Sequence, residues 1–304
     1  MSSHQHRSAG EQSDRNIRLL LLALLVVTAF LAGEVVVAVA SSSLALLADA
    51  GHMLTDALAI GMAIAAARLA RRPAAGVWTF GFGRAEVLSA SINGVTLLVV
   101  AAVVLVESVR RLSHPPDVAG GPVTAVAIVG LAVNVVVTLI LSRADRRSLN
   151  IAGVFAHALT DAYAFAATLA AGVLILTTGY RRADTIASLF VVLLMLRAAW
   201  TLLRRSGTVL LEMAPEGVDL VELRAHLLGT GQVLDVHDLH AWTVGTGLPA
   251  VSAHVVIVDD CFANGFAPQL LDELQGCLAG HFDVEHSTFQ LEPAGHTEHE
   301  SGTH

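Results

Sequence analysis

Six long apolar segments fill the first two thirds of the chain, and charged residues are almost absent from them. Each is close to the roughly 20 residues that a helix needs to cross the hydrocarbon core of a bilayer. Short polar connections separate the segments, and prolines such as Pro73 and Pro115 mark these connections as turns. The pattern predicts a six-helix membrane domain over residues 17–205, with spans at 17–39, 44–67, 87–109, 122–142, 151–177 and 184–203.

After residue 206 the pattern changes to that of a soluble domain, with leucines at helical spacing and two strand-like segments around the turn Gly245–Pro249. The order α-β-β-α-β predicts a small two-layer α+β domain over residues 206–292. Residues 1–16 are polar and expected to be disordered, and residues 293–304 form a tail that carries histidines. The expected elements are helix 215–230, strands 232–244 and 249–258, helix 267–281 and strand 284–292.

Composition strengthens the membrane assignment. The chain is 54% hydrophobic and 14% charged, whereas a soluble domain is about 25% charged. All its basic residues are arginines. Twelve of them flank the spans on the side of the N-terminus, against four on the other side, Arg110, Arg111, Arg181 and Arg182. Because positive charge is enriched on the cytoplasmic side of a membrane, we expect a multi-pass protein of the inner (cytoplasmic) membrane with both termini in the cytoplasm.

Residues 206–304 contain 15 acidic residues and a single arginine, Arg224. This charge argues against nucleic acid as a partner and suits a domain that meets cations. A solvated acidic surface that aids solubility is the alternative explanation. The two cysteines, Cys261 and Cys277, are too few for a disulfide scaffold and are expected to be thiols in a reducing compartment.

One short motif occurs twice in the membrane domain. The second span contains His52-Met-Leu-Thr-Asp56-Ala, and the fifth contains His157-Ala-Leu-Thr-Asp161-Ala. Each copy lies in the middle span of a set of three, so equivalent spans in the two halves run in opposite directions. The arrangement predicts a 3+3 inverted repeat, an architecture in which secondary transporters place the substrate site near the bilayer midplane.

The repeated histidines and aspartates have the spacing and chemistry of metal ligands. Residues four apart share one face of a helix, and an aspartate at the centre of a span costs about 2.5–3.5 kcal/mol on insertion. Such side chains are expected to pair or to bind metal. Two imidazoles and two carboxylates suit Zn²⁺ first, with Cd²⁺, Co²⁺ or Fe²⁺ behind it. The alternative is a pair of His–Asp hydrogen bonds that only hold helices together. Asp49 is a candidate for the access path.

Protons are the expected counter-ion, because metal ligands must lose their protons before they bind metal. A site that loads metal from one side and protons from the other would exchange the two. No catalytic residue and no cofactor are predicted. An intramembrane zinc hydrolase is a distant alternative, since it needs an open coordination position and a general base of the His-Glu-x-x-His type. A passive channel and a metal sensor are further alternatives.

Several stretches between about residue 17 and residue 292 occur in the order typical of a known family. Together they resemble the cation diffusion facilitator family, particularly its zinc-exporting bacterial members. The resemblance is carried by Ser43–Asp56, Thr79–Glu86, Ile92–Gly94, His157–Asp161, Val236–Trp242, Ser252–Val255 and His286–Glu292.

This resemblance implies a homodimer of six-span protomers, each with a cytoplasmic metallochaperone-like domain, that exchanges metal for protons by alternating access. It implies zinc or zinc/cadmium selectivity at a transport site formed by His52, Asp56, His157 and Asp161. It also implies additional metal in the cytoplasmic domain, for which the candidates by position are His237, His254, His286 and Glu292.

Strand geometry constrains the cytoplasmic candidates. Alternating side chains place His237 and His240 on opposite faces of a regular strand, so only one of them is expected in a given site, and the resemblance favours His237. His286 and Glu292 share a face but lie six residues apart, so both join one site only if the chain bends between them.

Two features depart from the family pattern. Tyr163 and Phe165 follow Asp161 where the family usually has small residues, so the metal preference is left open. The histidine-rich loop between spans four and five is absent, and histidines occur instead near the termini, at His4, His6, His296, His299 and His304.

Overall fold

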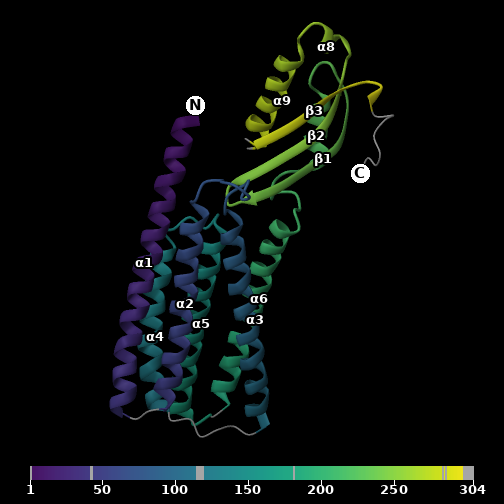
Figure 1. Ribbon diagram of the computed structural model, residues 1–304. Coiled ribbons are helices and arrows are strands. Elements are labelled where there is room, and N and C mark those ends of the chain that lie inside the picture. The colour runs from purple at the N-terminus through teal and green to yellow at the C-terminus, as the bar shows by residue number, and fades with distance from the viewer. Residues whose placement is uncertain are drawn as a thin grey trace. The chain divides into compact units, whose positions relative to one another are not determined.

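A computed structural model describes the backbone of residues 2–41, 44–113, 120–180, 182–282, 284 and 286–296 (Figure 1). Side chains are described for the same residues except 2–11, 37–41, 44–52, 112–113, 120–123, 126 and 184. The chain divides into two compact units, Met1–Ser206 and Gly207–His304. The first unit is helical, and the second combines helices with a small sheet.

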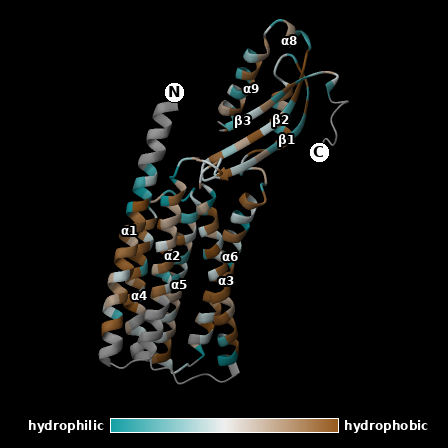
Figure 2. Cartoon of the chain, viewed as in Figure 1, coloured by the Kyte–Doolittle hydropathy of each residue, from teal (hydrophilic) through white to brown (hydrophobic). Residues whose placement is uncertain are grey.

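Long helices lie side by side in the first unit (Figure 1). Among the described residues, five segments are long and apolar enough to cross a membrane, and they lie in α1, α2, α3, α5 and α6. The described apolar part of α4, Ala127–Leu141, is shorter. Hydrophobic residues predominate along these helices (Figure 2), which confirms a helical membrane domain. The bounds are α1 Ser2–Ser41, α2 Leu44–Ala70, α3 Arg84–Ser113, α4 Gly120–Leu141, α5 Leu149–Thr178 and α6 Ala183–Leu210.

Two buried clusters hold the helices together. Leu20, Met53 and Ile151 belong to a core shared by α1, α2, α4 and α5. Leu97 and Met195 belong to a second core, which joins α3 to α6 and includes partly buried alanines of α5. Helix α5 therefore packs against neighbours on both sides, a position suited to a helix that carries half of a binding site.

A buried polar network ties the beginning of α5 to α2 and α3. The Asn150 side chain donates a hydrogen bond to the carbonyl of Ala63 (2.7 Å) and accepts one from the Ser89 hydroxyl (2.8 Å). Ser148 caps the helix by accepting a bond from the backbone N–H of Ile151. Buried polar groups are costly unless they are hydrogen-bonded, so these bonds fix the three helices to one another at this level.

The N-terminal segment differs from the expectation of disorder over residues 1–16, because α1 is helical from Ser2. Three of its described polar side chains contact the connection between α4 and α5. Gln12 donates to Asp145 (2.9 Å), Arg15 donates to the carbonyl of Arg143 (3.0 Å), and the backbone N–H of Asp145 donates to Asn16 (3.0 Å). These contacts accompany the part of α1 that precedes its apolar residues.

The second unit contains a three-stranded sheet in the order β1-β2-β3, with β1 antiparallel and β3 parallel to β2. The predicted order α-β-β-α-β is observed, with the four-residue helix α8 added before the second long helix. Sequence periodicity did not predict α8, because a single turn is too short to show a period. The bounds are α7 Leu220–Leu228, β1 Val233–Gly245, β2 Leu248–Ile257, α8 Asp260–Ala263, α9 Ala267–His281 and β3 His286–Pro293.

Helices α7 and α9 cover one face of this sheet. Their inward leucines are fully buried, and they pack on alternate strand residues such as Val236 and Val255, which are themselves fully buried. Because strand side chains alternate between faces, the neighbouring residues His237 and His254 lie on the other face. The leucines are Leu223, Leu227, Leu270, Leu274 and Leu278.

Candidate metal centres

The first candidate centre lies between α2 and α5 and is formed by Asp56, His157 and Asp161. His157 Nε2 is 2.8 Å from Asp56 Oδ1 and 3.4 Å from Asp161 Oδ2. All three side chains are buried, with at most 8% of each residue exposed. Nitrogen and oxygen ligands about 2.0–2.1 Å from a tetrahedral zinc are themselves about 3.4 Å apart, so the three groups are spaced as ligands of one ion.

A small cavity of about 20 Å³ adjoins these side chains and is also lined by Asn93 and Asn134. A space of this size holds about one water-sized occupant. His157 Nδ1 and Asn93 Oδ1 are both buried and have no hydrogen-bond partner among the described residues. The cavity therefore offers polar atoms to a small cation and excludes a large solute.

Two of the proposed membrane residues fall where side chains are not described. His52 belongs to α2, four residues before Asp56, and Asp49 lies one turn earlier still. The side chains of both lie outside the described residues. The structure thus brings together three of the four predicted ligands and leaves the position of the fourth side chain open.

The bulky residues beside Asp161 take different positions. Tyr163 is half exposed, at 50% of its surface. Phe165 is partly buried and packs on Gly130 of α4, where an added Cβ would overlap its ring. The Phe165 ring thus fills the space that Gly130 leaves, and α4 and α5 approach closely there.

A second candidate centre lies on the open face of the sheet in the second unit. Glu292 Oε1 is 2.8 Å from His254 Nδ1, and Glu292 Oε2 is 3.4 Å from His237 Nε2. Glu292 is 1% exposed, so its carboxylate is buried beside the two histidines. His237 and His254 are direct partners in the β1–β2 register, which places their rings 5.1 Å apart. These three residues form a compact set of nitrogen and oxygen ligands.

The expectation that His237 and His240 lie on opposite faces is wrong. His237 pairs with His254 and His240 pairs with Ser252, so both face the same side as these alternate residues of β2. The cause is an irregularity in β1, where Asp238 has a positive φ of 49° and an extra residue shifts the register, as in a β-bulge.

Asp238 joins this centre, and the sequence interpretation missed it. Its Oδ1 is 2.9 Å from His240 Nε2, and its Oδ2 is 3.8 Å from His254 Nε2. The only signal in the sequence was its place between two histidines, and simple alternation of the strand placed it on the face opposite to His237, the histidine expected in the site. The carboxylate links His240 to the cluster without bringing the His240 ring into it.

His286 lies at the beginning of β3, where it pairs with Ala250 and is exposed. His254, by contrast, pairs with Gln290, two residues before Glu292. Within the described residues, His286 is not part of the His237–His254–Glu292 group. His299 and His304 lie outside the described residues, as do the side chains of His4 and His6.

A bundle of apolar helices with a buried imidazole–carboxylate centre, joined to an acidic α+β domain with a second such centre, defines a membrane protein that handles cations. Comparison with known families agrees with this description. The cation efflux transmembrane domain matches residues 20–211, and the cytoplasmic domain of cation efflux proteins matches residues 215–294. The chain belongs to the cation efflux family, which confirms the resemblance to cation diffusion facilitators, and it is a transporter and not an enzyme.

Curated relatives are similar over nearly their whole length. The zinc transporter ZitB of Escherichia coli is 37% identical over 292 residues, which cover 95% of this chain and 92% of the relative. The metal cation efflux system protein CzcD of Cupriavidus metallidurans is 37% identical over 292 residues, covering 96% and 90%. A cadmium, cobalt and zinc/H(+)-K(+) antiporter of Bacillus velezensis is 35% identical over 295 residues, covering 96% and 93%.

Proposed function

We propose that the chain exports divalent cations, Zn²⁺ first, in exchange for protons, through a site formed by His52, Asp56, His157 and Asp161. The observation that carries this proposal is the convergence of Asp56 and Asp161 on one nitrogen of His157 inside a buried cavity. Two carboxylates so placed repel each other unless a cation or protons lie between them. Zinc readily accepts such mixed nitrogen and oxygen ligands.

Exchange follows from the same chemistry. The ligands must be deprotonated to hold metal, so each binding event releases protons and each protonation weakens the hold on metal. A site that opens alternately to the two sides of a membrane then couples metal export to proton entry. A relative named as a cadmium, cobalt and zinc/H(+)-K(+) antiporter supports this coupling.

We further propose that all six helices of the first unit span the inner membrane as a 3+3 inverted repeat with cytoplasmic termini. The described contacts of Gln12, Arg15 and Asn16 support this topology, since they place the beginning of α1 beside the connection between α4 and α5. That end carries most of the arginines that flank the helices, as the cytoplasmic side should.

In the cytoplasmic domain we propose that His237, His254 and Glu292 bind a regulatory metal ion, with His286 left outside that group. The buried Glu292 carboxylate beside two imidazoles supports this site. A homodimer completes the proposal, since a bound cation would offset the repulsion between two acidic domains.

Transport is tested with the purified chain in vesicles that hold a metal-sensitive dye and sustain a pH gradient. We expect Zn²⁺ flux to fall to the level of protein-free vesicles in Asp161→Asn. Glu107→Gln is the matched control, because Glu107 is an exposed acid on α3 that pairs with Arg111, and its flux should equal that of the unchanged protein. Cd²⁺, Co²⁺, Fe²⁺ and Mn²⁺ in the same assay rank the substrates.

Two outcomes would contradict the proposal. If Asp161→Asn lost thermal stability in detergent but retained full flux per folded molecule, the His–Asp contacts would only hold helices together. If a protonophore that collapses the pH gradient left the rate and extent of flux unchanged, the exchange with protons would be wrong.

A further inference from the structure

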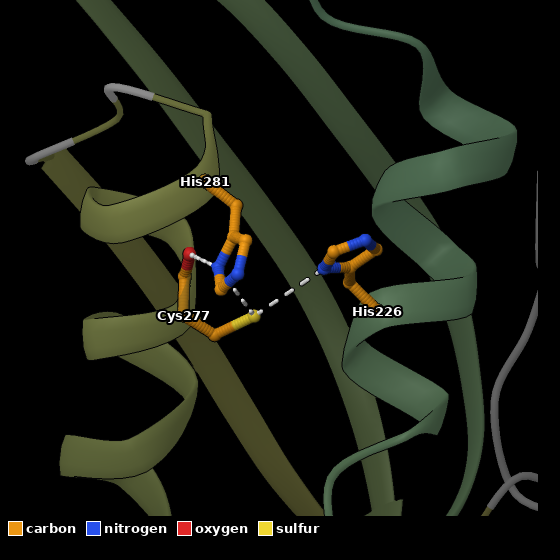
Figure 3. Close-up of side chains that lie close together, drawn as sticks. All are labelled: His226, Cys277 and His281. Carbon is orange, nitrogen blue, oxygen red and sulfur yellow. Dashed lines mark hydrogen bonds between the residues drawn. The ribbon is translucent and has the colours of Figure 1, made fainter.

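Three side chains of types that can ligate a metal converge between α7 and α9, on the helical side of the cytoplasmic domain (Figure 3). His226 lies on α7, and Cys277 and His281 lie four residues apart on one face of α9. Cys277 Sγ is 4.0 Å from His226 Nδ1 and 4.0 Å from His281 Nδ1. Each residue offers a ligand atom that lies within 4.8 Å of those of the other two.

These separations are close to those of a metal centre. With Zn–S near 2.3 Å and Zn–N near 2.0–2.1 Å, the sulfur and nitrogen ligands of a tetrahedral zinc are about 3.6 Å apart. The 4.0 Å between Cys277 Sγ and His226 Nδ1 therefore has to close only slightly. Both side chains are partly exposed, so small rotations suffice and an ion has a path of entry.

The surroundings of the two imidazoles bear on which ring nitrogens are available to an ion. Glu222, one turn before His226 on α7, places Oε1 3.9 Å from His226 Nε2, which is too long for a hydrogen bond, while Nδ1 is the His226 nitrogen that lies 4.0 Å from the sulfur. His281 donates from Nδ1 to the carbonyl of Cys277 at 3.1 Å, which leaves Nε2 as its ligand atom. Backbone carbonyl acceptors orient histidine ligands in this way in metalloproteins.

The backbone beneath the three side chains is held firmly. Leu223 lies three residues before His226, Leu227 directly follows it, and Leu278 directly follows Cys277. All three leucines are fully buried. The ring of Phe282, at the end of α9, meets the His226 ring edge to face with centroids 5.2 Å apart. The spacing of α7 and α9 is thus set by the domain core, so the cluster is preorganised for an ion.

The thiol decides which cations fit. Burial raises the pKa of the Cys277 thiol, so the metal-free cysteine is protonated at neutral pH and a bound ion has to displace that proton. Thiolate and imidazole together favour Zn²⁺, Cd²⁺ and Co²⁺ over Mg²⁺, Ca²⁺ and Mn²⁺, which prefer oxygen ligands.

We propose that His226, Cys277 and His281 form a separate metal site for a thiophilic divalent cation, with solvent as the fourth ligand. The site lies on the helical side of the sheet, whereas His237, His254 and Glu292 lie on the open side. Its ligands come from two helices, so a bound ion cross-links α7 to α9. This proposal does not depend on whether the chain exchanges protons for metal.

The test is a titration of the reduced, full-length protein in detergent with Co²⁺. Among the described clusters, neither the transport group nor the His237 group contains sulfur, so a thiolate-to-cobalt charge-transfer band reports the proposed site. We expect the band to saturate near one equivalent per chain, to disappear on addition of Zn²⁺, and to persist with Mg²⁺. Cys277→Ser should abolish it.

Cys261→Ser is the matched control, since Cys261 is buried and its thiol contacts Gln232 Oε1 at 3.4 Å, away from the cluster. This variant should keep the full band. The absence of a band in the unchanged protein, or its survival in Cys277→Ser, would overturn the proposal.

A second measurement keeps the thiol in place, in case Cys277→Ser folds poorly. In the Cys261→Ser protein, Zn²⁺ should slow maleimide modification of Cys277 at least tenfold, and this protection should be lost in the additional variant His226→Ala. Equal rates with and without Zn²⁺ would show that no metal binds at the cysteine, even if vesicle transport remained intact.

Discussion

At the scale of single residues, one imidazole contacts two carboxylates in the membrane domain. His157 Nε2 lies within 3.4 Å of oxygens from both Asp56 and Asp161. A single neutral histidine cannot donate fully to both, so the group is poised to accept a cation that satisfies all three. Glu292 plays the corresponding part in the cytoplasmic domain, where one buried carboxylate reaches His237 and His254 with its two oxygens.

Replacement of Glu292 by glutamine is expected to weaken metal binding by the cytoplasmic domain. The amide keeps the shape but loses the charge that holds the ion. Even the loss of a group that only orients a metal ligand costs about 10- to 100-fold in affinity, so the affinity for Zn²⁺ should fall by at least about that much. Isothermal titration of the full-length protein that carries both Asp161→Asn and Cys277→Ser measures this without the transport site and without the His226–Cys277–His281 site. Glu273→Gln, an exposed acid on α9, is the control and should bind as the parent does.

A matching loss of affinity in Glu273→Gln would mean that net charge, and not the buried carboxylate, attracts the ion. No loss in Glu292→Gln would exclude Glu292 as a ligand.

Sequence spacing was enough to select Asp56, His157 and Asp161, because residues four apart on a helix share a face and a repeated motif marks equivalent faces. It was not enough for the cytoplasmic centre. The roles of Glu292 and Asp238 depend on the parallel pairing of β3 with β2 and on the irregularity near Asp238. Both are long-range or backbone properties that residue types along one strand do not encode. The His226–Cys277–His281 group was missed for a similar reason, since it joins helices that are distant in sequence.

At the scale of elements, close approach of α4 and α5 depends on a small residue opposite a large one. Gly130 lies against the ring of Phe165, and membrane helices commonly use small residues to bring backbones together. Gly130 of α4 thus makes room for Phe165 of α5, the aromatic residue that departs from the family pattern. Its effect on the site is a matter of helix spacing, since Phe165 is not among the residues that line the cavity.

Gly130→Ala is expected to lower the stability of the membrane domain, because the new methyl group would overlap the Phe165 ring. Overpacking of this kind costs about 1–3 kcal/mol. Thermal denaturation in detergent should show a lower midpoint for Gly130→Ala, and the same change should cost less in a Phe165→Ala background, since the two sites are in contact.

Gly61→Ala supplies the comparison for that experiment. Gly61 lies within α2 and a Cβ there would meet no described atom within 4 Å, so the variant should be neutral or more stable by up to about 1 kcal/mol. Equal losses in the two alanine variants would indicate that the glycines matter for flexibility and not for the fit of Phe165.

At the scale of the whole molecule, charge is divided sharply between the two units. Residues 206–304 hold 15 acidic residues and one arginine, Arg224. That arginine donates hydrogen bonds to Asp235 and to the carbonyl of Val236. Two such domains repel each other in a homodimer, and the repulsion reaches about 10 Å at 0.1 M salt. Metal bound to these domains would lower it.

We therefore expect Zn²⁺ to tighten the dimer, and to do so more strongly at low salt than at high salt. The dimer dissociation constant of the full chain in detergent, measured by fluorescence energy transfer between labelled protomers, should fall by tenfold or more on addition of Zn²⁺ at 20 mM salt, on the order of 1.4 kcal/mol. The effect should shrink in Glu292→Gln. A dissociation constant that does not change with Zn²⁺ in the unchanged protein would rule out metal-driven dimerisation.

The Asn150 bond to Ala63 has a geometric consequence for how the transport site opens. Ala63 follows Asp56 by seven residues on α2, and Asn150 precedes His157 by seven residues on α5. At 1.5 Å per residue, the bond lies about 10 Å along each helix from the ligands. If it holds during transport it acts as a fulcrum, and a relative tilt of about 10° would part Asp56 from His157 by nearly 2 Å on that lever arm. A single interhelical amide would then convert a small rocking of two helices into release of the ion.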